Sequence, residues 1–370
     1  MILRLEDSKM YDANLRKCLE ELLLPQVSIK ERVFIWGTGN TAFLYQEGLK
    51  RLEGEGFSIE AYVDNDSKKW GKEFCGKRIV SPLELQSIKK DVSVLICSPQ
   101  PDIIRSLSAQ LTELGVNFFH IDEIIFKMHA QELLKVFDDL EDDSSKETYY
   151  SLVEARMAGS DIKESLFCEN QYFALPKFRM RNPKEVFVDC GAFVGDTVEE
   201  YIWKKDGVFE KIAAFEPDKK NFEAMQRRVE RLQDEWHINR DAIELYQYAV
   251  SNEMTLKGVE AYEKNNGLGS KIVDNSDSGE NCQVVAIDEM KIGQISFLKA
   301  DIEGYEYKML LGASESIRKW RPRLAVCIYH NAVDFYSIPL LIKSLVPEYK
   351  IAVRQHSYQL DDTVLYAWTE

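Results

Sequence analysis

The chain has 370 residues, of which 45% are hydrophobic, and its 47 Lys and Arg against 62 Asp and Glu give a net charge of −15. This length predicts two domains, and the hydrophobic content is sufficient for folded cores. The acidic balance argues against a nucleic-acid partner, because phosphates must be neutralised by clustered Lys and Arg. We also expect no membrane span, since no apolar run approaches the ~20 residues required, and no secretory leader.

The chain contains seven cysteines, none of them in a C-x-x-C pair, and only five histidines. Several of them fall in strand-like runs, which suits reduced, buried thiols and a cytoplasmic protein. No pair of residues has the ligand spacing of a zinc site, and we therefore expect no metal.

Residues 1–30 predict an N-terminal helix with leucines at helical spacing, and residues 31–125 predict a smaller Rossmann-like α/β domain. In that domain a predicted strand precedes the turn G-T-G-N-T-A, in which Gly37 and Gly39 follow the G-x-G-x-x-A pattern. Asp64 falls where a ribose-binding acid should lie. One interpretation is a second nucleotide site, for NAD(P) or a nucleotide-sugar. The other is a degenerate domain kept for packing or pairing, because only about four strands are visible.

Residues 126–170 predict a helical connector between two domains. The apolar residues around Leu133 and Tyr149 recur at helical spacing, and the acidic run at 138–147 predicts a solvated face. We therefore place the domain boundary here, with a second domain over residues 171–370.

The stretch Val186 to Thr197, V-F-V-D-C-G-A-F-V-G-D-T, predicts a buried strand, a glycine turn and a helix. Gly191 lets the backbone approach a ligand, and the helix start offers unpaired N–H groups. A dehydrogenase would carry G-x-G-x-x-G, whereas this turn reads D-x-G-x-x-x-G. Asp189 would repel a pyrophosphate and suits the α-ammonium group of S-adenosylmethionine. The next predicted strand ends in Glu216, which is placed to accept hydrogen bonds from ribose hydroxyls.

Six motifs in this order resemble the FkbM-type S-adenosylmethionine-dependent methyltransferases. They are the stretch just described, A-F-E-P-D (214–218), Y-A-V-S-N (248–252), L-K-A-D-I-E-G-Y-E (298–306), R-P-R-L-A-V-C-I-Y-H (321–330) and D-T-V-L-Y-A (362–367). The resemblance covers about residues 170–370. It implies an α/β fold with the seven-strand Rossmann-like sheet of class I methyltransferases, in which the final strand runs antiparallel. The implied cofactor is S-adenosyl-L-methionine. Residues 64–71 also resemble Rossmann-like accessory domains attached to some sugar-modifying enzymes.

The predicted cofactor site gathers the turn, the acid after the second strand and the later strand ends. Its residues are Asp189, Gly191, Ala192, Gly195, Thr197, Glu216, Pro217, Ala249, Val250 and Asp301. Two interpretations stay open for Tyr172 and Phe173, which precede the first strand of this domain: an aromatic lid over the cofactor and substrate, or packing on the core.

If the methyl acceptor is a hydroxyl, a base must lie within hydrogen-bond reach of it. His330 is the first candidate, because it follows the fifth strand and its ordinary pKa lies near neutrality. His356 is the second. Asp301 is expected to position the cofactor or substrate, and Glu303 to contact the substrate or to brace the turn. A magnesium ion held by these two acids is a metal-assisted alternative that ranks lower, because no third acid stands at a convincing position.

Residues 252–294 are long for a connection between strands. They predict a glycine-rich loop followed by a strand at Val284 to Ile287. Within the loop, Gly269, Ser270 and Lys271 are candidate substrate contacts. A mobile surface loop without a function is the alternative.

These patterns together predict a cytoplasmic S-adenosylmethionine-dependent methyltransferase that acts on a hydroxyl of a sugar, a glycan precursor or another small molecule. One alternative is an NAD(P)- or nucleotide-sugar-dependent sugar-modifying enzyme that uses residues 31–125. Another is a non-enzymatic binding protein with a methyltransferase fold. The expected partner is a small-molecule or carbohydrate acceptor. The oligomeric state stays open, a homodimer included.

Overall fold

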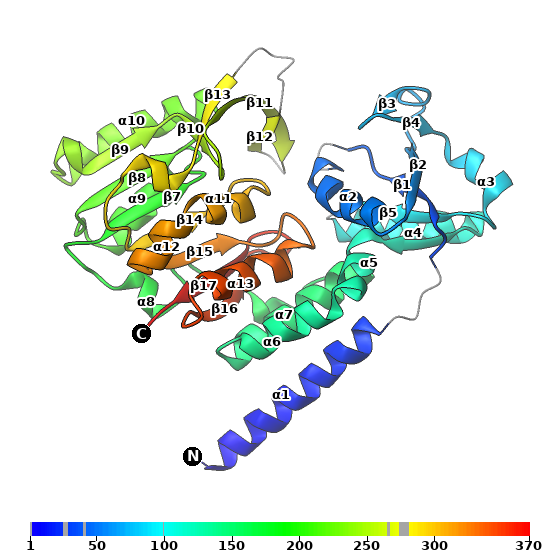
Figure 1. The fold of residues 1–370 in the computed structure, drawn as a ribbon, viewed down its shortest axis with the longest axis horizontal. Coiled ribbons are helices and arrows are strands. Elements are labelled where there is room, and N and C mark those ends of the chain that lie inside the picture. Colours follow the sequence, from blue (N-terminus) through cyan, green and yellow to red (C-terminus); the bar gives the residue numbers. More distant parts are fainter. Residues whose placement is uncertain (1, 25–28, 40–41, 99, 265–266, 274–280) are drawn as a thin grey trace. The chain divides into compact units, whose positions relative to one another are not determined.

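The computed structural model describes residues 2–24, 29–39, 42–98, 100–264, 267–273 and 281–370. It divides into two compact units (Figure 1). The first unit comprises Met1–Phe167, Asn331–Tyr336 and Ser357–Asp362, and the second comprises Cys168–His330, Ser337–His356 and Thr363–Glu370. Two short segments from the later half of the chain therefore belong to the first unit.

The first unit contains a six-stranded sheet in the order β3-β4-β2-β1-β5-β6. All neighbours pair in parallel except β3 with β4. The strands are β1 Arg32–Trp36, β2 Ser58–Val63, β3 Glu73–Phe74, β4 Lys77–Val80, β5 Ser93–Ile96 and β6 Asn117–His120. The sequence predicts four of them and misses β3 and β4, which are short and carry three charged residues. The helices beside this sheet are α2 Gln46–Gly54, α3 Leu85–Ile88 and α4 Pro101–Leu114.

Four helices complete the first unit: α1 Ile2–Leu23, α5 Ile121–Met128, α6 Ala130–Asp139 and α7 Asp143–Ala158. Asp142 caps α7 by accepting a hydrogen bond from Ser145 N at 2.7 Å, and Gly159 ends that helix in the left-handed region with φ 63°. Arg16 of α1 pairs with Asp138 of α6 at 2.7 Å. Two members of the acidic run at 138–147 therefore cap and pair helices in addition to facing solvent.

The second unit is built on a seven-stranded sheet in the order β16-β17-β15-β14-β7-β8-β9 (Figure 1). β17 runs antiparallel to both of its neighbours, and the other pairs are parallel. The strands are β7 Val186–Cys190, β8 Lys211–Phe215, β9 Ile243–Tyr246, β14 Phe297–Ala300, β15 Arg323–Cys327, β16 Lys350–Gln355 and β17 Thr363–Trp368. The predicted fold class, with an antiparallel final strand, is confirmed.

Helices connect these strands and cover the sheet (Figure 1). They are α8 Pro176–Arg179, α9 Asp196–Lys204, α10 Lys219–Glu235, α11 Glu306–Gly312, α12 Ser314–Trp320 and α13 Asp334–Leu345. Asp218 caps α10, because its Oδ1 accepts a hydrogen bond from Asn221 N at 2.9 Å. Among the described residues, none of the helices combines the length and the apolar content that crossing a membrane demands.

The stretch 252–294 differs from the predicted loop. It supplies most of a second sheet, in the order β10-β13-β11-β12. The strands are β10 Tyr248–Val250, β11 Thr255–Lys264, β12 Gly267–Val273 and β13 Asn281–Val285. β11 and β12 pair as an antiparallel hairpin, which the glycines of the segment conceal in the sequence because glycine is depleted in strands. The predicted strand at 284–287 corresponds to the end of β13.

An aromatic cluster fixes β7 in the core of the second unit. The ring of Phe187 stacks on Tyr201 of α9 at 4.3 Å and lies 4.9 Å from Phe297 of β14. Phe173 packs 5.9 Å from Phe297 and is fully buried, so packing on the core is the interpretation that holds for this residue. Burying each such side chain contributes about 1.5–3 kcal/mol. The end of β7, where the site lies, is thereby held in place.

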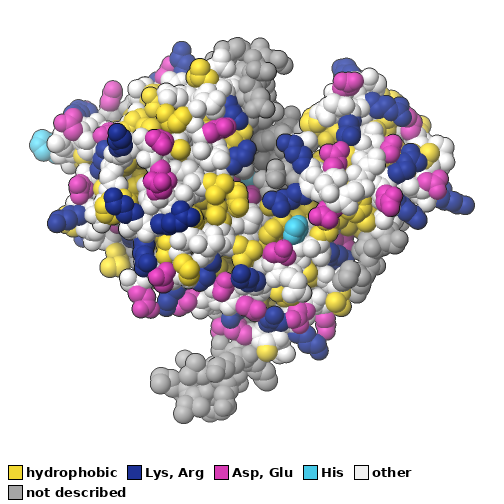
Figure 2. All heavy atoms as spheres, in the orientation of Figure 1, with side chains coloured by type: hydrophobic (Ala, Val, Ile, Leu, Met, Phe, Trp, Pro, Cys, Tyr) yellow, Lys and Arg dark blue, Asp and Glu magenta, His cyan; other side chains and the backbone are white. Residues whose placement is uncertain are grey.

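Charged side chains of both signs are interspersed on the face drawn in Figure 2. Nucleic-acid binding needs Lys and Arg gathered along a track, because each phosphate contact must be neutralised. The described residues on that face form no continuous basic track. The expectation of no nucleic-acid partner stays a prediction.

Candidate active site

The turn after β7 packs tightly against the end of β14. Gly191 N and Ala192 N both donate to the Phe215 carbonyl, at 3.0 and 2.9 Å. Gly191 has φ 81°, and a Cβ at this position would lie 1.9 Å from the Asp301 carbonyl oxygen. Only glycine fits this turn, because a side chain would push β7 and β14 apart. Gly195, with φ 79°, then starts α9.

Glu216 lies directly after β8, beside the glycine turn, and only 4% of it is exposed. Its Oε2 accepts a hydrogen bond from Phe193 N at 2.9 Å, and its Oε1 accepts one from Asp218 N at 2.9 Å. Burial raises the pKa of this carboxyl to about 7. Each oxygen keeps a further lone pair, so the carboxylate can also accept hydrogen bonds from two vicinal hydroxyls of a ribose.

The structure differs from the prediction that Asp189 faces a ligand ammonium. The Asp189 side chain is fully buried and forms an ion pair with Lys299 Nζ of β14 at 3.0 Å. The same Nζ donates to the Gly191 carbonyl at 2.7 Å. Burial alone would lower the pKa of Lys299, but Asp189 and Asp301 raise it, so the lysine stays charged. Asp189 therefore braces the turn through Lys299, an internal cation that the motifs did not indicate.

The remaining predicted cofactor residues are small or buried. Ala192 and Thr197 belong to the turn and the first turn of α9, and Ala249 and Val250 lie on β10 next to β13. All four are at most 7% exposed, and Pro217 is half-buried after Glu216. Their contact with a cofactor stays a prediction.

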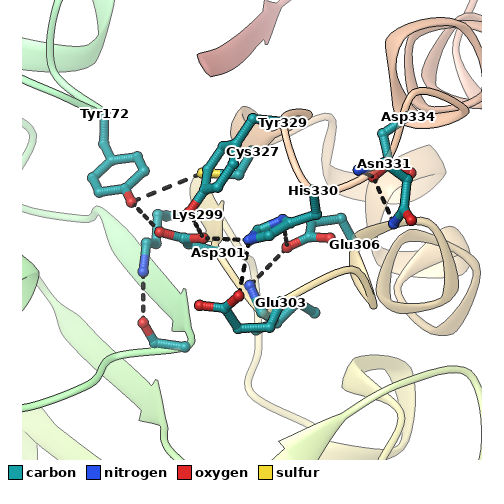
Figure 3. A network of polar contacts seen from close by, with 12 residues as sticks. Tyr172, Lys299, Asp301, Glu303, Glu306, Cys327, Tyr329, His330, Asn331 and Asp334 are labelled. Atoms are coloured by element: carbon teal, nitrogen blue, oxygen red, sulfur yellow. Dashed lines mark hydrogen bonds and ion pairs between the residues drawn. The ribbon is translucent and has the colours of Figure 1, made fainter. Parts of the chain in front are cut away.

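Asp301 follows β14 and is the centre of a hydrogen-bond network (Figure 3). The hydroxyl of Tyr172 donates to Asp301 Oδ2 at 2.8 Å, and that of Tyr329 donates to Oδ1 at 3.1 Å. Tyr172 is 6% exposed, and its ring lies 5.0 Å from Lys299 Nζ. Tyr172 thus joins the site through Asp301, whereas its neighbour Phe173 joins the core.

His330 lies among three carboxylates (Figure 3). Its Nε2 is 3.5 Å from Asp301 Oδ1 and 3.4 Å from Glu303 Oε2, and its Nδ1 is 3.2 Å from Glu306 Oε1. Burial alone would lower the pKa of His330, but Glu306 and Glu303 raise it well above its ordinary value. The three carboxylates therefore favour the protonated ring, which has no lone pair to accept a proton. The surroundings of His330 leave its predicted role as the base without support.

His356 is engaged at both ring nitrogens by groups outside this cluster. Nδ1 donates to the Cys168 carbonyl at 2.5 Å, and Nε2 accepts from the Tyr366 hydroxyl at 2.9 Å. Burial lowers the pKa of His356 to about 4, so the ring is neutral at pH 7. These contacts join β16, β17 and the chain before Tyr172. They give His356 a structural position and leave its predicted catalytic role without support from the geometry.

The other predicted residues lie elsewhere. Gly269, Ser270 and Lys271 are on β12, where Ser270 pairs with Ala261 and Lys271 with Glu260 of β11. Their side chains lie outside what the structure describes.

In the predicted second nucleotide site of the first unit, the acid Asp64 is already engaged by neighbouring side chains. Lys69 Nζ contacts Asp64 Oδ2 at 2.8 Å, and the Thr38 hydroxyl donates to the same oxygen. A Cβ on Gly37 would lie 2.5 Å from the Cys97 carbonyl oxygen, so this glycine serves chain packing, whereas Gly39 has open space. Asp64 is thus paired within the unit instead of being presented to a ribose.

Sequence reasoning missed Lys299, Glu306 and Tyr329. Two of them carried a readable signal. Lys299 is a cation inside an otherwise apolar strand, and Glu306 is the third acid of the motif D-I-E-G-Y-E. Tyr329 had none, because one more aromatic residue near a strand end is ordinary core composition.

The matches to known families and structures follow the same division of the chain. Residues 189–358 match the family model of the methyltransferase FkbM domain, and residues 29–121 match a model described as C2185-like, N-terminal. The strand order and the glycine turn define the second unit as a class I methyltransferase fold. The match over residues 189–358 supports a methyltransferase domain of the FkbM kind within this part of the chain.

A solved structure shares this fold. Methyltransferase FkbM from Methylobacillus flagellatus KT is 19% identical and aligns over 98% of this chain and 99% of its own, with a TM-score of 0.56. An rRNA methylase from Streptococcus thermophilus is 15% identical over 51% of this chain and 89% of its own, with a TM-score of 0.32. None of the curated protein sequences matches this chain.

Proposed function

We propose that the second unit transfers a methyl group from S-adenosyl-L-methionine to a hydroxyl oxygen of a sugar, a glycan precursor or another small molecule. One observation supports this choice of cofactor. The Gly191 turn and Glu216 lie beside each other, at the carboxyl ends of two neighbouring strands. Open α/β sheets bind ligands at this edge. The adenosine end would bind near Glu216 and the methionyl end near the turn.

The acceptor side of the proposed site is the network around Asp301. The side chains of Asp301 and Glu303 are 20% and 17% exposed, so they reach solvent where the buried His330 does not. Carboxylates and tyrosine hydroxyls bind hydroxyl groups by hydrogen bonds, which favours a polyhydroxylated acceptor. The choice of a carbohydrate follows from this chemistry.

The proposed reaction is an in-line displacement. An acceptor oxygen forms a bond to the methyl carbon while the sulfur–carbon bond breaks and its electron pair stays on sulfur, which yields S-adenosylhomocysteine. The hydroxyl proton passes to a carboxylate of the Asp301 and Glu303 pair. The rate gain comes chiefly from holding the oxygen opposite the sulfonium, since the displacement needs that alignment.

Calorimetric titration with S-adenosylhomocysteine tests the cofactor. We expect micromolar binding by the wild type and at least a tenfold loss in Glu216→Gln, which keeps the shape but removes the charge that two ribose hydroxyls would share. Glu244→Gln is the matched control, because Glu244 is a partly buried acid on β9 that pairs with Lys211 at 2.8 Å. Equal affinity in Glu216→Gln and Glu244→Gln, or no binding by the wild type, would remove the proposal.

A further inference from the structure

Carboxylates gather around one imidazole in the active-site network. Among the described residues, Asp301, Glu303 and Glu306 face His330, and Lys299 is paired with Asp189. The side chains of Glu306 and His330 are fully buried. Buried carboxylates of this kind favour a cation that they can share.

The buried imidazole points its nitrogens into the cluster without making a hydrogen bond. Neither Nδ1 nor Nε2 of His330 has a hydrogen-bond partner among the described residues, and neither does Glu306 Oε2. The ring still lies 3.2–3.5 Å from three carboxylate oxygens. A fully buried histidine without a hydrogen bond is costly unless something else uses its lone pair.

The Nε2 side of the ring has the spacing of a metal site. Nε2 lies 3.5 Å from Asp301 Oδ1 and 3.4 Å from Glu303 Oε2. Ligand atoms on a tetrahedral ion with bonds of about 2.0–2.2 Å are roughly 3.3–3.6 Å apart. Asp301, Glu306 and His330 also each offer a ligand atom within 4.8 Å of the other two. The separations of His330 Nε2 from the Asp301 and Glu303 oxygens are therefore those that one ion imposes.

Glu306 occupies the position of the carboxylate that stands behind a metal-bound histidine. Its Oε1 lies 3.2 Å from Nδ1 and accepts a hydrogen bond from Ile302 N at 2.7 Å, so it cannot swing away without freeing that amide. A carboxylate at Nδ1 holds a proton on that nitrogen, so an ion that displaces the proton from Nε2 would bind the lone pair on the side of Asp301 and Glu303.

We propose that His330 Nε2, Asp301 and Glu303 bind one divalent cation, with Glu306 orienting the imidazole. One nitrogen with two carboxylates suits Zn²⁺ or Mn²⁺ better than Mg²⁺, which prefers oxygen ligands alone. Three protein ligands would leave a position open for an oxygen of the acceptor, and the Glu303 oxygen that does not bind the ion would take the hydroxyl proton. This role for the ion rests on the proposed methyl transfer to a hydroxyl, whereas the binding of the ion does not.

Metal binding is measured on the full chain without a tag, stripped with chelator and titrated separately with ZnCl₂, MnCl₂ and MgCl₂. We expect one Zn²⁺ or Mn²⁺ per chain, and at least tenfold weaker Mg²⁺. His330→Gln and Glu303→Gln should each weaken binding at least tenfold. His237→Gln is the matched control, since His237 is an exposed histidine of the same unit.

The affinity for S-adenosylhomocysteine is measured on the same samples. It tests the proposed function independently of metal binding, and it shows whether each variant is folded. A variant that keeps this affinity but loses the metal supports the site. Wild-type protein that binds S-adenosylhomocysteine but takes up less than half an equivalent of each of the three metals overturns it. Equal metal affinity in His330→Gln and His237→Gln also overturns it.

Discussion

Glu216 is a carboxyl whose charge state changes within the physiological pH range. Its burial raises the pKa to about 7, although two backbone N–H groups donate to it and oppose that rise. An unoccupied site at pH 6 therefore contains mostly the acid form. Ribose hydroxyls that donate hydrogen bonds favour the carboxylate, so a ligand must displace the proton in order to bind.

This coupling predicts that S-adenosylhomocysteine affinity falls as the pH drops below about 7. The dissociation constant should rise about tenfold per pH unit, because the proton that is lost on binding becomes harder to remove. Above pH 8 the affinity should be level. Titrations between pH 5.5 and 8.5 measure this, with Glu216→Gln as the comparison. The same slope in that variant would show that another group is responsible.

At the scale of elements, the end of α11 packs against the chain that directly follows β10 of the second sheet. A Cβ on Gly312 would lie 2.1 Å from the Ser251 carbonyl oxygen and 3.0 Å from Asn252 Cα. These are backbone atoms, which cannot rotate away as a flexible side chain can. Ser251 N is itself bonded to the Val285 carbonyl at 2.9 Å, so β10 and β13 would have to move with it.

Gly312→Ala should therefore destabilise the second unit by about 1–3 kcal/mol, as overpacking does. Gly54→Ala is a matched change with the opposite sign. Gly54 ends α2 with open space around its Cα, and alanine there should stabilise by about 0.5–1 kcal/mol. Urea unfolding of the two variants measures both changes in the free energy of unfolding. An unchanged free energy of unfolding in Gly312→Ala would mean that the backbone at Ser251 moves aside at little cost.

The elements that could be predicted from the sequence are those with a clear apolar period. The strand, turn and helix predicted over Val186 to Thr197 correspond to β7, the Gly191 turn and the start of α9, because a short β-prone run bordered by a turn rarely forms anything but a strand. β3 and β4 are too short for a period, and the β11 hairpin contains glycines that resemble a loop. The motifs indicated the cofactor edge of the sheet. They could not show that Asp189 is paired internally, because its partner Lys299 is more than a hundred residues away and reaches it only through β14.

At the scale of the whole molecule, the first unit depends on a residue from the later half of the chain. The Phe335 ring is fully buried and lies 5.5 Å from that of Phe126, with the Arg156 guanidinium 5.0 Å from its centre. Its carbonyl accepts a hydrogen bond from the Tyr149 hydroxyl at 3.0 Å. The unit that begins the chain is thus completed by residues 331–336.

Phe335→Ala should consequently destabilise the first unit by about 3–5 kcal/mol. Hydrogen exchange measured peptide by peptide should show faster exchange in α5 and α7, which pack on this ring. Leu83→Ala, at a residue that is 67% exposed in the same unit, should change exchange little. Unchanged protection of α7 in Phe335→Ala would mean that the first unit holds together without that segment.

The place of β17 between β15 and β16 bears on how the protein is made. In the seven-stranded sheet, as far as the structure describes the chain, β16 pairs with β17 alone, and β15 lacks its outer neighbour until residues 363–368 have been synthesised. At a translation rate of ~5–20 residues per second, the edge of β15 stays open for seconds on each nascent chain. An open, apolar strand edge is a template for pairing with other chains. Nascent chains of this protein should therefore be most prone to aggregation, and most in need of chaperones, during that interval.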